Sequence, residues 1–511
     1  LFKPSDMKLS GYNLKNIEAQ DVVMPPASVF DLPEKVLQFG TGVLLRGLPD
    51  YFIDKANRQG LFNGRVVVVK STTTGDTSAF DKQDGLYTLC VRGLENGKKI
   101  EENIINAAIS RVLSAHHEWG EILKCAHNPH MQIIISNTTE VGIQLVKDDV
   151  RKHPPVSFPG KLLAFLYERY QAFAGSKQSG MVIVPTELIV DNGKKLESIV
   201  LELAHLNGLD DNFIQWLENA NYFCSSLVDR IVPGKPGAED LRKLESQLGY
   251  TDELLTICEA YRLWAIEGND HIRSVLSFAA ADEGVVIEPD INLFRELKLR
   301  MLNGTHTLSC GLAHLAGFDT VRSAMEHPDM SAFISNLMLQ EIAAGIPYNV
   351  PDAVAKDFGR KVLDRFRNPY LDHHWLSITM QYTSKMRMRN VPVIMKYAAT
   401  KKAVPENIAL GFAAYLLFLR PVVKKGETYY GNWNGQEYAI NDDHANYFYQ
   451  KWQQYGEADI AAYVLGDGSL WGEDLSAIPG FAASVKEKMA ALSQGDVIKT
   501  IQSNLIKKVP A

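Results

Sequence analysis

Short apolar runs alternate with longer amphipathic stretches in the first part of the chain, up to about residue 290. The runs are rich in Val and Ile and mostly apolar on both faces; they lie at 35–39, 65–69, 131–135, 181–184 and 285–287. Parallel strands that are covered on both sides of a sheet have this pattern. Helix-compatible stretches separate several of the runs, for example at 45–60 and 162–173. The alternation predicts an α/β domain built on a doubly wound sheet.

The pattern changes after about residue 290, where strand-like runs largely stop. Long amphipathic segments follow one another there, at 293–317, 330–344, 353–366 and 407–419, and 426–441 is typical of a loop or short hairpin. These segments predict a mainly α-helical C-terminal domain. We therefore expect an N-terminal α/β domain over residues 1–288 and a helical C-terminal domain over residues 289–511.

Composition and charge narrow the class of protein. Apolar residues make up 46% of the chain and charged residues 22%, which is ordinary for a globular protein. The net charge of −7 lacks the basic footprint of nucleic-acid binding, so we expect no nucleic-acid partner. The longest apolar run, 408–419, is shorter than the roughly 20 residues that span a bilayer, and it predicts a buried helix and no membrane partner.

The cysteines are far apart and form no CxxC pair: they are Cys90, Cys125, Cys224, Cys258 and Cys310. Their spacing indicates neither a disulfide framework nor a thiolate metal site. The first residues also lack the apolar core of a signal peptide. We therefore expect a cytoplasmic protein with reduced, buried cysteines and no bound metal.

A glycine-rich turn follows the first apolar run. Its residues are Gly40, Thr41, Gly42, Val43 and Leu44. Glycines at the end of a strand permit a tight turn and close backbone approach, and the next helix supplies amide donors to a pyrophosphate. The turn predicts a Rossmann-type dinucleotide site, although Leu45 replaces the third glycine of the usual fingerprint.

Two further strand ends are expected to line the cofactor crevice. The second strand ends in Lys70 and not in the usual acidic residue, so Lys70 either faces a 2′-phosphate or is solvated, and the choice between NAD and NADP stays open. The third strand leads into Ser136, Asn137, Thr138 and Thr139, which are either cofactor contacts or a simple turn; the position favours contacts to the ribose or nicotinamide.

Lys298, Asn303 and His306 begin the helical half of the chain. On an α-helix, which turns about 100° per residue, they fall within an arc of roughly 140°. A lysine in such a site can transfer a proton when burial lowers its pKa, an asparagine can donate to the reacting oxygen, and a histidine can orient the substrate. Taken alone, the same residues are also compatible with a solvated lysine, a capping asparagine and a core histidine.

The spacing Lys-x4-Asn-x2-His resembles the signature of the polyol-specific long-chain dehydrogenases, or mannitol dehydrogenase family. The resemblance extends in order over nearly the whole chain; further similar stretches lie at 38–47, 136–140, 223–232 and 365–369. It implies an NAD-dependent, metal-independent oxidoreductase with an N-terminal Rossmann-type domain and a helical C-terminal domain. It also implies that Lys298 is the acid/base and that Asn303 and His306 contact substrate oxygens, with Asp229 near them.

Within this family the chain is most similar to the branch that interconverts tagaturonate and altronate, through 83–87, 136–139, 185–189 and 366–370. Mannitol dehydrogenases carry Cys-Asp-Asn where this chain has Thr186, Glu187 and Leu188, and a substrate-binding arginine of theirs aligns with Ser377. The resemblance places Glu187 among the expected substrate-binding residues. Both departures favour a substrate with a different polar end, such as the carboxylate of a sugar acid.

Basic residues after 365–369 are candidates to bind that carboxylate, because Arg and Lys pair well with carboxylates. They are His373, Lys385, Arg387 and Arg389, and each is equally compatible with a surface charge on a helix. Fructuronate, mannitol or another hexitol remain alternative substrates. A non-catalytic dinucleotide-binding protein is the alternative from another class.

Overall fold

The computed structural model describes residues 7–138 and 142–506, and the chain divides into two compact units. Unit 1 comprises Leu1–Gly93 and Lys99–Ile291; unit 2 comprises Leu94–Lys98 and Asn292–Ala511. The division predicted after residue 288 falls between the same two elements, β13 (Val285–Glu288) and α10 (Asn292–Leu297). The grouping of Leu94–Lys98 with unit 2 was not predicted.

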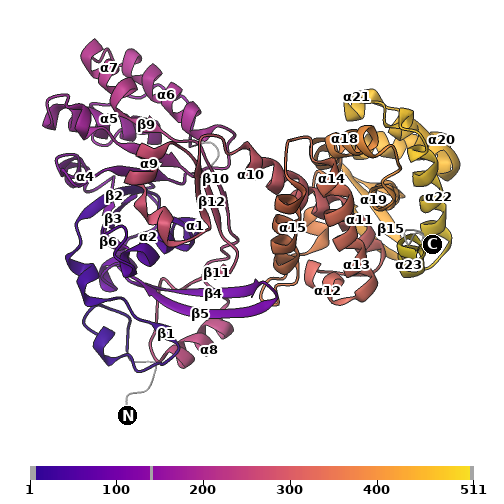
Figure 1. Cartoon of the computed structure of the whole chain (residues 1–511), viewed down its shortest axis with the longest axis horizontal. Coiled ribbons are helices and arrows are strands. Elements are labelled where there is room, and N and C mark those ends of the chain that lie inside the picture. Colours follow the sequence, from indigo (N-terminus) through magenta and orange to yellow (C-terminus); the bar gives the residue numbers. More distant parts are fainter. Residues whose placement is uncertain (1–6, 139–141, 507–511) are drawn as a thin grey trace. The chain divides into compact units, whose positions relative to one another are not determined.

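A six-stranded parallel sheet forms the centre of unit 1 (Figure 1). Its spatial order is β6 (Ile109–Ser114), β3 (Arg65–Lys70), β2 (Glu34–Phe39), β7 (Ile133–Ser136), β8 (Val182–Pro185) and β9 (Tyr222–Phe223). The chain builds outward from β2 in one direction and then from β7 in the other. This is the doubly wound arrangement that the sequence predicted, and the strand order reverses between β2 and β7, where sheets of this kind bind ligands at the carboxyl ends of the strands.

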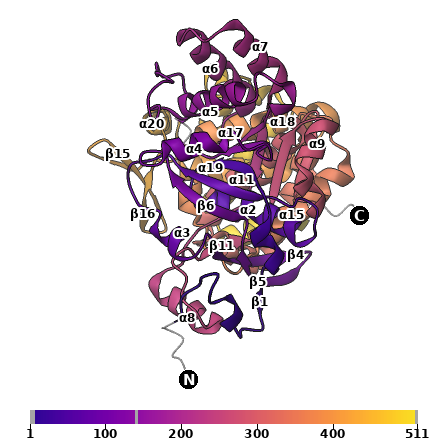
Figure 2. The same cartoon turned by 90° about the vertical axis from the view of Figure 1, so that its left-hand side faces the viewer.

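Both faces of this sheet are buried, because alternate strand residues enter two different cores. Leu37, Val67 and Ile134 pack with helices α4 (Trp119–Cys125), α5 (Phe158–Ala172), α6 (Asn192–Leu206) and α7 (Asp211–Ala220). The last three of these helices lie together in Figure 2. Val36 and Val68 point the other way. The Val- and Ile-rich runs are therefore apolar on both faces for a physical reason.

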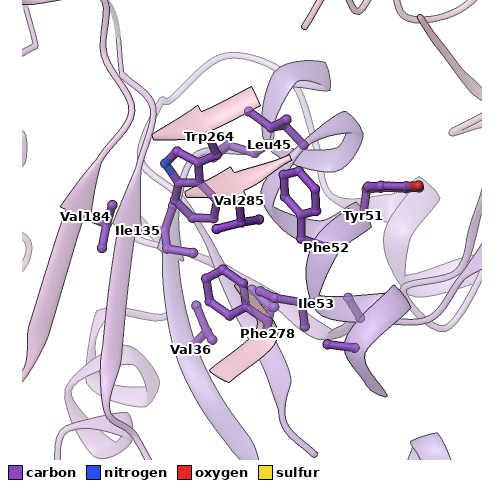
Figure 3. Close-up of a cluster of buried hydrophobic side chains, with 14 of the residues drawn as sticks. Val36, Leu45, Tyr51, Phe52, Ile53, Ile135, Val184, Trp264, Phe278 and Val285 are labelled. Atoms are coloured by element: carbon purple, nitrogen blue, oxygen red, sulfur yellow. The ribbon is translucent and has the colours of Figure 1, made fainter. Parts of the chain in front are cut away.

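The second core is closed by helix α2 (Pro49–Arg58) and by strands of another sheet (Figure 3). Its aromatic centre is Trp264, which stacks on Phe52 and Phe278 with ring centroids 6.5 and 5.5 Å apart. The covering sheet consists of β10 (Ser226–Asp229), β12 (Leu263–Glu267) and β13. The predicted strand 285–287 is thus a strand, but it belongs to this sheet and not to the doubly wound one.

Unit 1 carries further elements around these two layers. A four-stranded sheet has the order β1 (Val22–Val23), β5 (Lys98–Asn106), β4 (Tyr87–Glu95) and β11 (Thr256–Glu259). The remaining helices are η1 (Leu14–Asn16), η2 (Ala27–Asp31), α1 (Val43–Gly47), α3 (Ser78–Lys82), η3 (Lys177–Ser179), α8 (Ala238–Leu248), α9 (Asp270–Val275) and η4 (Ser277–Ala281). The predicted helix 45–60 is in fact two helices, α1 and α2, which are separated at Leu48 just before Pro49.

Unit 2 is mostly helical, as predicted (Figure 1). Its helices are α10, η5 (Lys298–Gly304), α11 (Thr305–Leu315), α12 (Val321–Glu326), α13 (Pro328–Asn336), η6 (Leu337–Ile342), α14 (Ala343–Gly345), α15 (Asp352–Phe366), α16 (Trp375–Ile378), α17 (Tyr382–Arg389), α18 (Val391–Lys401), α19 (Glu406–Phe418), α20 (Ala445–Leu465, broken at Gly456), α21 (Gly468–Trp471), η7 (Leu475–Ala477), α22 (Phe481–Gln494) and α23 (Val497–Ile506). The segment predicted as a loop or hairpin forms a small antiparallel sheet of β14 (Val423–Lys425), β15 (Thr428–Trp433) and β16 (Gln436–Ile440).

Helix α19 is the centre of unit 2, and its residues from Asn407 to Phe418 are all buried. This confirms the buried helix predicted from the apolar run. Its N-terminus is capped by Glu341, whose carboxylate accepts hydrogen bonds from the amides of Asn407 and Ile408 at 3.0 and 2.8 Å. In the described part of the chain no helix is long and apolar enough to cross a membrane. All five cysteines are buried and free.

Arg169 holds one side of the doubly wound sheet together from helix α5. Its buried guanidinium donates to four backbone carbonyls, those of Ser179, Ala126, Asn128 and Met131, at 2.6 to 3.0 Å. Burial lowers the pKa of Arg169 to about 10. A single buried guanidinium therefore holds these four backbone carbonyls in place.

We expect Arg169→Met to lower the free energy of unfolding by about 3 kcal/mol, because it leaves several buried carbonyls without a donor. Urea unfolding followed by circular dichroism measures the change. The matched control is Arg242→Met, which removes an exposed arginine. Equal stability of the two variants would mean that the hydrogen bonds of Arg169 do not stabilise the fold.

Candidate active site

The glycine turn closes the carboxyl end of β2 in unit 1. Gly40 has a φ of 131°, and a Cβ at this position would lie 3.0 Å from the carbonyl oxygen of Asn137, so glycine is required. Gly42 is the residue before helix α1, and apart from its two chain neighbours no atom of the described residues lies within 4 Å of the position that a Cβ would take there. The backbone of the turn is therefore open on one side. This fits the close approach of a dinucleotide pyrophosphate.

The residues after Gly42 pack the turn against unit 1. Leu45, at the third position of the fingerprint, is fully buried. The close contact that a third glycine usually permits occurs at Gly47, where a Cβ would lie 2.8 Å from a methyl carbon of Val232. The departure from the fingerprint is thus compensated two residues later. The remaining predicted cofactor residues of the turn are half-buried: Thr41, Val43 and Leu44.

Glu187 fixes the neighbouring strand end, after β7. Its carboxylate accepts from the Ser136 hydroxyl at 3.1 Å, the Thr138 amide at 2.8 Å and the Thr138 hydroxyl at 3.0 Å. The Asn137 amide group donates to the carbonyl and hydroxyl oxygens of Thr186 at 3.2 and 3.0 Å. These bonds hold the predicted cofactor residues 136–138 beside Gly40. Thr139, predicted with them, lies outside the described residues.

These contacts make buried Glu187 a positioning residue for the crevice. Its predicted contact with substrate stays a prediction. The adjacent Leu188 is 62% exposed.

Lys70 ends strand β3, where the adenosine ribose of a dinucleotide lies. The side chain is buried, and its ammonium donates to the Thr72 carbonyl at 2.6 Å. The alternative that Lys70 is simply solvated is therefore wrong, because the ammonium orders the loop after β3. The hydroxyl of Ser71 is buried beside it and has no partner within the described residues. The NADP alternative for this strand end stays open.

A buried polar cluster lies below the glycine turn. Asp50 is fully buried in helix α2 and accepts from the Gln38 amide group of β2 at 3.2 Å. Burial raises the pKa of Asp50 to about 7, against the opposing effects of the Gln38 hydrogen bond and the Arg46 charge. Oδ1 of Asp50, Oε1 of Gln38 and Nε of Arg46 are buried without partners within the described residues. The sequence pattern did not predict this cluster.

The catalytic candidates lie in unit 2 on one continuous helical segment, α10–η5–α11. Its middle, Lys298–Gly304, is a π-helix, in which hydrogen bonds run from residue i to i+5. Lys298 and Asn303 are five residues apart, which on an α-helix would separate them by about 140° around the helix axis. Because a π turn contains about five residues, the two side chains instead lie nearly above one another. Both are half-buried. Such π turns occur frequently at functional sites.

His306 follows one turn later and is enclosed by aromatic rings. It stacks on Phe366 with centroids 4.2 Å apart and planes at 12°, and it meets His373 and Trp375 edge-on at 5.2 and 6.0 Å. Burial is the main cause and the electrostatic effects of His373, Arg365, Arg389 and Lys385 follow; together they lower the pKa of His306 well below its ordinary value. The imidazole is therefore neutral at pH 7. Its Nε2 is buried and has no partner in the described ranges.

Asn303 is tied to helix α17 through its backbone. Its carbonyl accepts from the Thr307 hydroxyl at 2.9 Å and from Nη1 of Arg389 at 3.4 Å, and Nη1 also donates to the Thr307 hydroxyl at 3.1 Å. Arg300 joins the same helices, because it donates to the carbonyls of Met388 and Arg389 at 2.5 and 2.9 Å. The π turn is thus fastened to the end of α17.

The structure separates the predicted carboxylate-binding residues. Lys385 and Arg389 are one turn apart on α17 and are half-buried. Arg387 points to another side of the helix, and its guanidinium lies 3.4 Å from the position that a Cβ would take on Gly472. His373 is exposed and touches the His306 ring. Contacts of His373, Lys385 and Arg387 with a substrate stay predictions.

Asp229 ends strand β10 in unit 1 and is buried. Its predicted proximity to Lys298, which lies in unit 2, stays a prediction. Two residues that sequence reasoning did not select also belong to the site: Thr307 and Phe366. Phe366 lies in the motif 365–369, which was noted only as a family resemblance.

The comparisons with known proteins agree with the two units. Residues 34–277 match the family described as Mannitol dehydrogenase Rossmann domain, and residues 290–493 match the Mannitol dehydrogenase C-terminal domain. An altronate oxidoreductase of Bacillus subtilis (strain 168) is 41% identical over 88% of this chain and 90% of its own length. One of Escherichia coli O1:K1 / APEC is 36% identical over 90% of this chain and 94% of its own length.

A solved structure has the same fold. It is the ternary complex of Pseudomonas fluorescens mannitol 2-dehydrogenase with NAD and D-mannitol, with a TM-score of 0.65, 21% sequence identity and coverage of 98% of this chain and 100% of that chain. At this identity the likeness supports the fold alone. The predicted α/β plus helical architecture and the family resemblance are confirmed by these matches.

We expect the stability of the protein to depend on Asp50 between pH 5 and 8. The folded chain keeps this proton up to about pH 7, whereas an unfolded chain releases it near pH 4. Stability from this group is therefore fully present below about pH 4 and falls as the pH rises to about 7. Asp50→Asn cannot ionise, so its free energy of unfolding relative to wild type should rise by about 2.5 kcal/mol from pH 5 to pH 8.

Chemical unfolding at the two pH values measures this difference. Asp31→Asn, which alters an exposed carboxylate, is the control and should show no such rise. A constant difference between wild type and Asp50→Asn would mean that Asp50 is ionised throughout this range.

Proposed function

The chain belongs to the mannitol dehydrogenase family, and on that premise we propose that it is an NAD-dependent oxidoreductase that interconverts D-tagaturonate and D-altronate. The observation that carries the proposal is the π turn at Lys298–Gly304, which gathers Lys298 and Asn303 one turn before the neutral His306. A proton-transfer group, an amide and an imidazole on one helical segment suit the reduction of a carbonyl.

The glycine turn and the end of β7 would hold the coenzyme. The open backbone at Gly40–Gly42 suits the pyrophosphate, and the ordered residues Ser136–Thr138 suit the ribose or nicotinamide. Bound reduced NAD supplies the hydride that adds to the keto carbon. Lys70 leaves NADP as the alternative coenzyme.

Lys298 would give a proton to the carbonyl oxygen as that oxygen gains negative charge, and would take it back in the reverse direction. Asn303 would donate a hydrogen bond to the same oxygen through its side-chain amide. Neutral His306, held by Phe366, would orient a substrate hydroxyl. Arg300 keeps the π turn in register with helix α17 and acts as a positioning residue.

The acid substrate is supported by two independent facts. The relatives named altronate oxidoreductase cover about nine-tenths of this chain at 36 to 41% identity. The family resemblance also implies that Leu188 and Ser377 stand where mannitol dehydrogenases carry polar substrate contacts. We propose a role in hexuronate breakdown in the cytoplasm; fructuronate is the alternative acid substrate.

We expect Lys298→Met to lower kcat for tagaturonate reduction by about 10²- to 10⁴-fold, the usual contribution of a positioned proton-transfer group. Oxidation of NADH and NADPH with tagaturonate, fructuronate and fructose side by side measures both coenzyme and substrate. Lys356→Met, on the exposed side of helix α15, is the matched control.

The outcomes separate the alternatives. Fast turnover with fructuronate or fructose in place of tagaturonate would keep the mechanism and change the substrate. Full activity of Lys298→Met would remove the lysine from the mechanism. No turnover with any of the three substrates would favour a non-catalytic dinucleotide-binding protein.

A further inference from the structure

We propose that Arg389, with Lys385 beside it, binds the carboxylate of the substrate and so distinguishes a sugar acid from the neutral sugar of the same shape. The proposal rests on the function proposed above and identifies the residue that sets its specificity. It also selects among the four basic side chains that follow residues 365–369.

The first argument is position. Arg389 and Lys385 are four residues apart on α17 and therefore lie on one face of the helix. Nη1 of Arg389 reaches the Thr307 hydroxyl and the Asn303 carbonyl on the catalytic segment. Lys385 donates to the Ile378 carbonyl at 3.0 Å, and its charge acts on His306. Both cations thus lie on the side of α17 that faces the catalytic candidates.

The second argument is charge. Burial lowers the pKa of Arg389, and burial together with the positive charge of Arg389 lowers the pKa of Lys385. Among the described residues neither side chain forms an ion pair with a carboxylate, and Nε of Arg389 is buried without a partner. The acidic group that does act on Lys385 is Asp442, whose oxygens accept from the backbone amides of Thr383 and His444.

Two half-buried cations without a counter-ion are unfavourable in the free protein. Arg365 also acts electrostatically on His306, besides the two α17 cations. A ligand that brings a negative charge relieves this repulsion, whereas a neutral hydroxyl does not. Arginine in addition presents parallel N–H donors that match a carboxylate.

A matched pair of substrates tests the proposal. Tagatose differs from tagaturonate in having a CH2OH group in place of the carboxylate. We expect Arg389→Gln to raise KM for tagaturonate on the order of 10- to 100-fold, the usual loss for a charge-assisted hydrogen-bonded pair. Loss of the Arg389 contacts with Asn303 and Thr307 should change kcat by the same factor for both sugars, whereas KM should rise for tagaturonate alone, so that the preference for the acid disappears.

Three further variants sharpen the result. Arg389→Lys keeps the charge but loses the parallel donors, and it should fall between wild type and Arg389→Gln. Lys385→Gln should lower the preference for the acid by a smaller factor. Lys396→Gln neutralises an exposed lysine of α18 and should behave as wild type. An equal loss for acid and neutral substrate in Arg389→Gln would overturn the proposal.

Equilibrium binding separates this proposal from the proposed function. Calorimetric titration of the full chain with altronate and with altritol, its neutral counterpart, requires no turnover. If wild type binds altronate more tightly and Arg389→Gln does not, the subsite stands even where tagaturonate is not reduced. Equal binding of altronate and altritol by wild type would refute it. Tighter binding of inorganic phosphate than of altronate would also refute it and would assign the cations to a phosphate group.

Discussion

A parallel sheet has to be covered on both faces, and in unit 1 most other features depend on this requirement. Because every connection crosses over the sheet, the carboxyl ends of all its strands meet at one edge. The glycine turn after β2, residues 136–138 after β7 and Glu187 after β8 are therefore neighbours, although about 150 residues separate the first from the last in sequence. Glu187 then stabilises this edge, since its carboxylate binds two residues of the adjacent strand end.

The parts of the fold that could be predicted are those with a local signal. Val- and Ile-rich runs identified four strands of the doubly wound sheet, and the long amphipathic segments identified the helical unit. The strand at 285–287 was predicted, but its sheet was not, because a strand's partners are chosen by tertiary packing. The break at Leu48 was missed although Pro49 marks it: Leu48 has non-helical backbone angles, and proline cannot donate a helical hydrogen bond. The π turn at Lys298–Gly304 was missed because it differs from a regular helix only in hydrogen-bond register, and the same apolar spacing accommodates both.

In the candidate site, too, the features with a motif in the sequence could be predicted and those set by the surroundings in the fold could not. Lys298, Asn303 and His306 carried a motif, and the structure places them on one helical segment. The aromatic enclosure of His306, the absence of an acidic partner for Arg389 among the described residues and the raised pKa of Asp50 are properties of three-dimensional neighbourhoods. The spacing of residues along the chain does not predict whether a basic side chain forms an ion pair in the folded protein. Lys385 and Arg387, two positions apart on one helix, were equivalent candidates in sequence and have different surroundings in the fold.

The π turn also has a consequence for how this segment of the chain can change. A π turn holds one residue more than the α turn it replaces, so it behaves as a one-residue insertion that the helix has absorbed without ending. Removal of one residue between 298 and 304 would restore a regular helix and improve its hydrogen bonding. If the same residues formed a regular α-helix instead, Lys298 and Asn303 would lie about 140° apart. Hydrogen-bond regularity and the alignment of the candidate residues are therefore in opposition at this segment, and the fold keeps a less regular helix than hydrogen bonding alone would produce.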